Sequence, residues 1–326
     1  MRFINKEKAI SLMNSFGARK RPFIFIIDYL QENIIIEEAS SIDNSSILYD
    51  FNGFSNFKTK YTSSNNPQIE IFPQSIKDYE KYFNIVKDNI NKGNSYLVNL
   101  TCSTPININL QLEELFFRAK ALYKFMLRDK FIVFSPEIFI KIKDGYVYSY
   151  PMKGTIDASL PNAESIIMND PKEAAEHATI VDLIRNDLSI IASDVSVPKY
   201  RYIDRIQTNK SVLLQVSSEV RGKLQDNWLN NIGSILFSLL PAGSISGAPK
   251  KKTQEIIAEA ETYNRGFYTG IMGYFDGENL DSSVMIRFIE KDGDKFFFKS
   301  GGGITSRSEL NSEYNEMIQK IYVPIY

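Results

Sequence analysis

The sequence predicts an α+β fold built on largely antiparallel sheets. Segments with strand-like patterns occur in blocks, and these blocks are separated by helical segments instead of alternating with them one by one. The dipeptide Asp144-Gly145, flanked by β-rich residues, predicts a tight hairpin. The chain has 326 residues, 43% hydrophobic and 24% charged, which is enough for one large globular domain.

The N-terminal portion, residues 1–67, is predicted to contain a strand pair. Residues 23–30 and 33–40 alternate in polarity around Gln31-Glu32-Asn33. The stretch TSSNNP at 62–67 is rich in turn formers and separates this short portion from a catalytic core at about 75–326. We treat 1–326 as one domain.

The core is predicted to begin with two helices around a strand. These are an amphipathic helix at 77–92, a strand at 94–102 and a helix at 110–123. Residues 130–152 are strand-rich and contain the hairpin.

A long helix then starts at Asp170, an N-cap residue, and Pro171, which suits the first helical position, and extends to about residue 191. The remaining expected elements are strands at 195–224, helices at 228–240 and 248–261, strands at 267–304 and a last helix at 308–323.

Composition restricts the possible partners. The formal net charge is −1, so no global field attracts nucleic acid or an anionic membrane. With Cys102 as the sole cysteine, no disulfide framework and no cysteine-based zinc site can form within one chain. The N-terminus lacks a signal-peptide pattern, and no apolar run reaches the roughly 20 residues that span a bilayer. We therefore expect a cytoplasmic protein without nucleic-acid or membrane partners.

Two acidic pairs predict a divalent-cation site. Glu173 and Glu176 share one helix face, and Glu313 and Glu316 repeat this spacing, with Lys320 one turn beyond. Four carboxylates on two helices suit Mg²⁺, which takes few protein ligands and leaves positions for substrate oxygens. Two ordinary solvated helix faces are the alternative, which spacing alone favours.

The neighbouring polar residues indicate supporting roles. His177 follows Glu176 directly, so it does not complete a Glu-x-x-His pattern, and we expect it to be structural. The segment DLIRNDLS at 182–189 is expected to form a buried network that fixes the helix. The run Lys250 to Lys252 is expected to be a solvated helix face.

Two glycine-containing loops and one lysine are further candidates. GSISGAPK at 243–250 leads into a helix, whose free N–H groups favour an anion, although a plain loop fits equally. KSGGGIT allows close backbone approach to a ligand at Gly301 to Gly303, or forms a flexible turn. Lys153 in YPMKGT is either an exposed lysine or, if desolvated, a nucleophile with a lowered pKa.

Taken together and in this order, eight segments resemble the chorismate-utilising enzyme family. They extend from about Ser95 to Lys320 and comprise SPE, PMKGT, EAAEHATIVDLIRNDL, GSISGAPK, NRGFYTGIMGY, MIRF, GGGI and SEYNEMIQK. The resemblance implies a single unit in which two antiparallel sheets pack together with helices outside.

The resemblance also assigns site residues. Glu176 and Glu316 match the magnesium ligands, with Glu173 and Glu313 as supporting carboxylates, and the Mg²⁺ binds the ring carboxylate of chorismate. The positions matching substrate-binding residues are Thr155, Ser246, Gly247, Tyr268, Arg287, Gly302, Gly303 and Lys320.

Lys153 is similar to the lysine of aminodeoxychorismate synthase component I, because anthranilate synthases usually have alanine there. The resemblance implies that Lys153 attacks C2 of chorismate while the 4-hydroxyl leaves, assisted by Glu137. Ammonia then attacks C4 to give 4-amino-4-deoxychorismate for folate synthesis. Since the chain has no glutaminase residues, the ammonia is expected from solution or from a glutamine amidotransferase subunit.

Several positions depart from the family pattern. Leu97 replaces a usual glutamine, and it cannot activate water as the lysine of isochorismate synthases does. Gln215 stands where a histidine is usual, and GTIDAS at 154–159 differs from the usual GTRPRG. The short N-terminal portion implies an absent or incomplete tryptophan site. Anthranilate synthase component I and a non-catalytic chorismate-fold binding protein are the alternatives.

Overall fold

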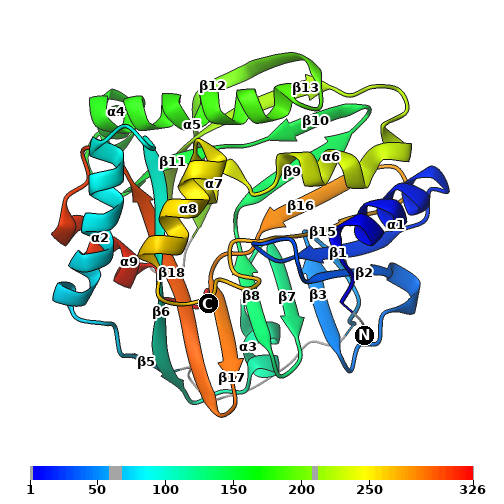
Figure 1. Cartoon of the computed structure of the whole chain (residues 1–326), viewed down its shortest axis with the longest axis horizontal. Helices are drawn as coiled ribbons and strands as arrows, with labels where there is room; N and C mark the ends of the chain where they lie inside the picture. The colour runs from blue at the N-terminus through cyan, green and yellow to red at the C-terminus, as the bar shows by residue number, and fades with distance from the viewer. Residues whose placement is uncertain (1–2, 59–67, 208–211, 326) are drawn as a thin grey trace.

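The chain forms two antiparallel sheets that pack face to face, with helices on both outer faces (Figure 1). This computed structural model describes residues 3–58, 68–207 and 212–325. The predicted α+β class with two packed sheets is confirmed. The predicted loop at 62–67 lies outside the described residues.

Sheet A contains nine described strands, all paired antiparallel. In sheet order they are β11 (Met152–Asp157), β13 (Val212–Lys223), β10 (Tyr146–Ser149), β9 (Ile138–Lys143), β16 (Leu280–Val284), β15 (Ile271–Phe275), β1 (Phe23–Ile27) and β2 (Ile34–Glu38), with β12 (Ser193–Gln207) also paired to β13.

Sheet B also has nine strands within the described ranges. In sheet order they are β14 (Gly247–Ala248), β6 (Leu97–Ile108), β18 (Lys295–Ile304), β17 (Phe288–Asp292), β8 (Phe131–Ser135), β7 (Tyr123–Leu127), β3 (Ile47–Phe51) and β4 (Phe54–Ser55), with β5 (Ile69–Ile71) also paired to β6. The N-terminal portion therefore contributes strands to both sheets.

The helices divide between the two outer faces. Sheet A is covered by α1 (Lys6–Ala18), α4 (Ala163–Asn169), α5 (Pro171–Ser189) and α6 (Ile232–Leu239). Sheet B is covered by α2 (Ile76–Asn91), α3 (Leu112–Arg118), α8 (Lys250–Ala260) and α9 (Leu310–Gln319). The short α7 (Gly243–Ser246) contacts both α5 and α8, and two 3₁₀ turns are η1 (Ala39–Ser41) and η2 (Trp228–Asn231).

The core consists of three hydrophobic layers. One lies between sheet A and its helices, and one between sheet B and its helices. The third lies between the two sheets and is rich in aromatic rings, among them Phe51, Phe125 and Phe288. Strand β1 is covered on both faces, so all five of its residues are buried and the predicted alternation of polarity was wrong. The predicted strand pair is confirmed, because β1 pairs with β2 and Ile27 lies opposite Ile34.

Local signals placed several elements correctly. Asp144 and Gly145 both have positive φ, at 52° and 76°, and connect β9 to β10 as the hairpin prediction required. Asp170 caps α5 by accepting the N–H groups of Lys172 and Glu173. The helix predicted at 110–123 is wrong in its second half, because α3 ends at Arg118 and Tyr123 opens the buried strand β7.

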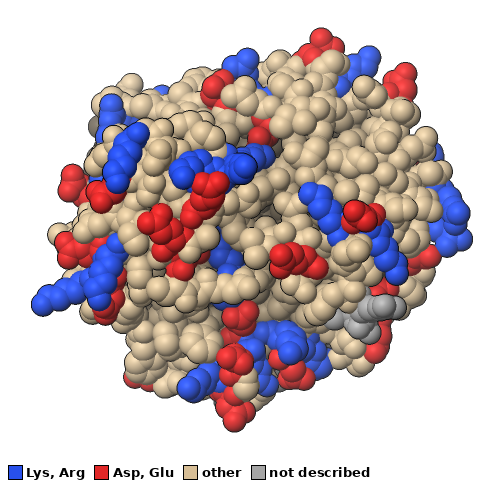
Figure 2. All heavy atoms as spheres, in the orientation of Figure 1, with Lys and Arg blue, Asp and Glu red and all other residues tan. Residues whose placement is uncertain are grey.

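The surface carries both signs of charge. Figure 2 shows acidic and basic side chains interspersed on one face of the molecule. Among the described helices, none is both long and apolar enough to cross a bilayer.

Replacing Phe275 with alanine should lower the free energy of unfolding by about 3–5 kcal/mol, because the cavity cannot collapse in a packed core. The ring is fully buried and lies 5.5 Å from Phe23 and 6.2 Å from Trp228 between centroids. Urea denaturation measures the loss. Phe72→Ala is the control, since Phe72 is 45% exposed and should change stability far less. Equal effects would contradict this account of the core.

Candidate active site

The α5 helix brings one carboxylate pair against strand β11. Glu173 and Glu176 lie on the first two turns of α5, next to the Asp170 cap. Gly154 on β11 has φ of 82°, and a Cβ atom there would lie 2.9 Å from Glu173 Oε2. The glycine therefore permits the close approach of this carboxylate to the strand, and any side chain would displace it.

Lys153 neighbours that glycine and forms the central ion pair of the site. Its Nζ lies 2.9 Å from Glu176 Oε2. Burial disfavours the ammonium form, but the charge and hydrogen bond of Glu176, with the charges of Glu316 and Glu173, outweigh it and raise the pKa of Lys153. In this state the lysine is a cation and not a nucleophile, contrary to the lowered pKa that desolvation alone predicts.

The α9 helix brings the second carboxylate pair against strand β18. A Cβ atom at Gly302 would lie 3.2 Å from Glu316 Oε1 and 3.5 Å from Glu313 Oε2. Lys320 pairs with Glu316 Oε1 at 2.7 Å and donates to the carbonyl of Gly301 at 2.8 Å. The charge of Lys153 acts on Glu313 as well, so both helices contribute to one electrostatic cluster.

This cluster has the chemistry of a site for a hard divalent cation. Its donors are carboxylate oxygens, and Glu173 Oε2 is buried without a hydrogen-bond partner in the described structure. Burial and the neighbouring carboxylates raise the pKa of both Glu173 and Glu313, an unfavourable state that a bound cation relieves. Among the described residues, no group of three or more His, Cys, Asp or Glu side chains lies close enough together to hold a metal ion.

Glu137 lies where β8 passes into β9 and offers an acid. Its Oε1 accepts a hydrogen bond from Ser244 Oγ at 2.9 Å. Burial raises the pKa of Glu137, opposed by this hydrogen bond and by the charges of Lys320 and Arg287. Ser244 is not among the predicted site residues, although it lies in the GSISGAPK segment, because spacing does not reveal which way a loop side chain points.

Arg287 and Tyr268 supply a cationic and aromatic wall. Arg287 has φ of 53°, uncommon for a side chain of this size, and its guanidinium lies 4.8 Å from the centre of the Tyr322 ring. Its buried Nε has no hydrogen-bond partner in the described part of the chain. Arg287 also acts electrostatically on the buried Tyr268 and on Glu137. A donor held this way is suited to an anion such as a carboxylate.

The glycine loops meet at Leu97. Gly247 is opposite Val98 in the β14 to β6 pairing, and a Cβ atom at Gly303 would lie 3.0 Å from Leu97 Cδ1. Leu97 is 9% exposed and makes this wall apolar. Ser246 is buried, and both its hydroxyl and its backbone N–H donate to the Ala242 carbonyl, at 2.8 and 3.1 Å.

Thr155 is the most exposed of the predicted substrate-binding positions. Its side chain is exposed, and the residue is opposite Gln215 in the β11 to β13 pairing. Of the other predicted positions, Lys320 and Gly302 lie beside Glu316, and Gly303 and Gly247 lie beside Leu97. Arg287 acts electrostatically on Glu137 and Tyr268.

The predicted network at 182–189 is only partly present. Asp182 and Arg185 are exposed and pair with each other, whereas Asp187 is buried and pairs with Lys250 at 2.9 Å. Lys250 is therefore not part of a solvated face. His177 is buried with Nε2 at 2.7 Å from Ser218 Oγ, and burial with nearby Arg201 lowers its pKa to about 4.

The buried ion pair of Arg265 with Glu261 binds the backbone of strand β6. Arg265 contacts Glu261 at 2.6 Å and donates to the carbonyl of Asn99 at 2.6 Å, while Glu261 accepts from the N–H and hydroxyl of Thr101. These contacts fix the part of β6 that presents Leu97.

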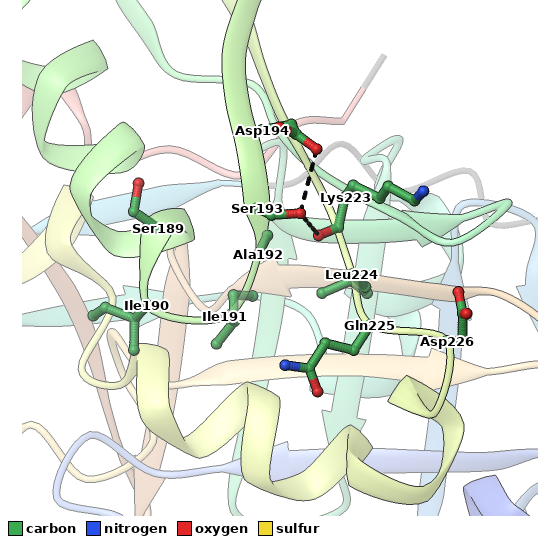
Figure 3. Close-up of a pocket in the computed structure, with 10 residues that line it drawn as sticks. All are labelled: Ser189, Ile190, Ile191, Ala192, Ser193, Asp194, Lys223, Leu224, Gln225 and Asp226. Carbon is green, nitrogen blue, oxygen red and sulfur yellow. Dashed lines mark hydrogen bonds between the residues drawn. The ribbon is translucent and has the colours of Figure 1, made fainter.

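A surface cavity of about 630 Å³ lies away from this site (Figure 3). It is open and lined by the segments 189–194 and 223–226, where Ser193 Oγ contacts Asp194 and the Lys223 carbonyl, each at 3.4 Å. None of the predicted site residues lines it.

Comparison with known proteins identifies relatives along the whole chain. Residues 24–325 match the family model of chorismate binding enzymes. An uncharacterized PabA-like protein of Pasteurella multocida is 49% identical over 97% of this chain and 98% of its own length. The menaquinone-specific isochorismate synthase of Escherichia coli has the same fold, with a TM-score of 0.71 at 15% identity over 98% of this chain and 82% of that one.

Two relatives with named activities match only part of the chain. Anthranilate synthase component 1 of Acetivibrio thermocellus is 37% identical over 57% of this chain and 38% of its own. Aminodeoxychorismate synthase component 1 of Bacillus subtilis is 34% identical over 58% of this chain and 40% of its own.

Glu261→Gln should lower the free energy of unfolding by about 3–5 kcal/mol, because it leaves the buried Arg265 cation uncompensated. Chemical denaturation measures this change. Glu255→Gln is the matched control, since its pair with Lys252 is exposed and should contribute nothing measurable. A Glu261 variant as stable as the control would show that the buried pair does not support β6.

Proposed function

Because the chain belongs to the chorismate-binding enzyme family, we propose that it is an aminodeoxychorismate synthase component I. It would convert chorismate and ammonia to 4-amino-4-deoxychorismate, the precursor of 4-aminobenzoate in folate synthesis. The observation that carries this proposal is the position of Lys153, an amine 2.9 Å from Glu176 and within the field of both carboxylate pairs. An alanine at this position would leave the site without a nucleophile.

Lys153 must lose a proton before it reacts. Glu176 keeps it charged, while burial, the largest single influence on its pKa, acts in the opposite direction. When Glu176 is engaged by another partner, burial therefore favours the neutral amine. The amine then forms a bond to C2 of chorismate, the ring double bond shifts and the C4–O bond breaks.

Glu137 supplies the proton that lets the 4-hydroxyl leave as water. Its raised pKa keeps a larger share of the carboxyl protonated than an exposed glutamate would have. Ammonia then bonds to C4, the C2–N bond to Lys153 breaks, and the lysine is regenerated. The net change is chorismate plus ammonia to 4-amino-4-deoxychorismate plus water.

The carboxylates fit a bound Mg²⁺. Glu176 and Glu316 would hold it, supported by Glu173 and Glu313, and when bound it neutralises a substrate carboxylate as a Lewis acid. Arg287 and Lys320 would bind and orient the remaining substrate carboxylate charge. Tyr268, Thr155 and the backbone at Ser246, Gly247, Gly302 and Gly303 would enclose the substrate.

We propose that ammonia comes from a separate glutamine amidotransferase subunit. The chain has one cysteine, and burial raises the pKa of Cys102 to about 12, so this thiol does not serve as a glutaminase nucleophile. The sole histidine, His177, is buried on α5.

Anthranilate synthase component 1 is the second candidate, since several proteins of that name are among the relatives. The products separate the two, because anthranilate forms without an added lyase. Mass spectrometry of the product made from chorismate, ammonium and Mg²⁺, with and without a lyase, tests the proposal. Anthranilate formed directly by the chain would overturn it.

Lys153→Ala should reduce formation of 4-amino-4-deoxychorismate by about 10³-fold, because the amine that displaces the hydroxyl is lost. The rate with saturating ammonium is the measurement. Lys143→Ala is the control, an exposed lysine on strand β9 of the same sheet, and should react at the wild-type rate. A Lys153 variant with full activity would remove this residue from the mechanism.

Glu316→Gln should weaken Mg²⁺ binding by about 10- to 100-fold, because one anionic ligand becomes neutral. Calorimetric titration with Mg²⁺ alone measures this without requiring turnover. Glu309→Gln is the control, since Glu309 is exposed one residue before α9. Identical titrations for both variants would place the ion elsewhere.

A further inference from the structure

Two motifs, RNDL and GSISGAPK, meet in one ion pair. Lys250 Nζ lies 2.9 Å from Asp187 Oδ1 and donates to the carbonyl of Leu239 at 2.7 Å. Asp187 is 9% exposed and also accepts the backbone N–H of Gly243. The end of α5, the end of α6 and the starts of α7 and α8 are thereby tied together.

The fit around Gly243 leaves α7 little freedom. A Cβ atom at Gly243 would lie 3.0 Å from Asp187 Oδ2 and 3.1 Å from Leu183 Cδ2. A side chain at this position would come closer than ordinary van der Waals contact, so the backbone of the turn packs directly on α5. Ser244 is the next residue of this turn.

Ser244 in turn contacts the acid of the proposed reaction. The main chain of Glu137 is anchored, because its carbonyl accepts from Ser283 Oγ at 2.7 Å and from Val284 N–H at 3.1 Å. Its side chain accepts a hydrogen bond from the hydroxyl of Ser244 at 2.9 Å. Lys320 and Arg287 are the charged groups that act on it.

We propose that Ser244, held by the Asp187–Lys250 ion pair, is a positioning residue that orients the Glu137 carboxyl group for proton transfer. This inference rests on the proposed function. Because Ser244 donates to Oε1, the transferable proton lies on Oε2, and the group is restrained from rotating. A hydroxyl donor stabilises the carboxylate, so Ser244 also limits the rise in the Glu137 pKa that burial causes.

Helix α5 carries both Asp187, which forms the ion pair with Lys250, and the carboxylates Glu173 and Glu176. Asp187 follows Glu176 by eleven residues, which is about three turns at ~3.6 residues per turn, so both side chains lie on the same side of the helix. A rigid helix thus sets the distance between the carboxylates at its start and the α7 turn at its end.

Ser244→Ala and Ser244→Thr test the proposal against Ser238→Ala, an exposed serine of α6 that bonds the Ile235 carbonyl. Infrared difference spectra follow the carboxylic C=O band of Glu137 with pH, assigned by its loss in Glu137→Gln. In Ser244→Ala the band should persist to higher pH, because the donor that stabilises the carboxylate is gone. Threonine, which keeps the hydroxyl, should restore the wild-type titration.

Kinetics provide the second readout. The alkaline limb of kcat/KM for chorismate consumption should move to higher pH in Ser244→Ala, and kcat should fall about 10-fold, corresponding to ~1.4 kcal/mol. Melting temperature and Mg²⁺ titration should match those of Ser238→Ala. An unchanged infrared titration and an unchanged limb would overturn the proposal.

Two further variants separate this inference from the proposed function. Lys250→Met should reproduce the infrared shift of Ser244→Ala with less than additive effect in the double variant, because both act through one contact. Additive shifts would overturn the role of the ion pair. If instead Glu137→Gln retained full chorismate consumption, the acid role within the proposed function would fail, whereas the infrared titration would still report whether Ser244 holds Glu137.

Discussion

The candidate site depends on one ammonium group, Lys153, whose charge acts on carboxylate pairs from two helices. Like charges at this spacing repel each other, and burial raises the pKa of Glu173 and Glu313 further. The arrangement persists because a cation, Lys153, pairs with Glu176, and because glycines at 154 and 302 let the carboxylates approach the strands. The same ammonium that stabilises the cluster is the amine of the proposed reaction, so stability and reactivity compete at this residue.

The two-sheet architecture explains where this cluster can form. Strand β11 lies at one end of sheet A, and β14, β6 and β18 lie at one end of sheet B. In Figure 1, β11, β6 and β18 lie on the same side of the molecule. The aromatic layer between the sheets lies among β1, β3, β7, β8 and β17 instead. Packing and chemistry thus use different parts of the same sheets, and the helices α5 and α9 connect each hydrophobic layer to the cluster.

Sequence patterns predicted the features that depend on neighbours in the chain. The cap at Asp170 and the hairpin at Asp144-Gly145 depend on a few adjacent residues, and the structure confirms both. Features that depend on contacts between distant segments could not be predicted from the local sequence pattern. Strand β1 is buried on both faces, so its polarity carries no period-2 signal, and α3 ends early because Tyr123 is needed in β7. The acidic pairs were visible as helix spacing, but their meeting with Lys153 depends on tertiary packing, and so does the contact of Ser244 with Glu137.

One departure from the family pattern, leucine at position 97, bears on which side chains take part in the proposed reaction. Leucine at position 97 is apolar and has no side-chain proton acceptor. In the proposed reaction, the groups that act on the ring are Lys153 and Glu137, an amine and an acid of raised pKa. An amine nucleophile needs its proton removed, while a hydroxyl leaving group needs one supplied. A site that places the amine beside carboxylates and the acid beside a serine donor meets these opposite requirements on separate elements, β11 and the β8–β9 junction.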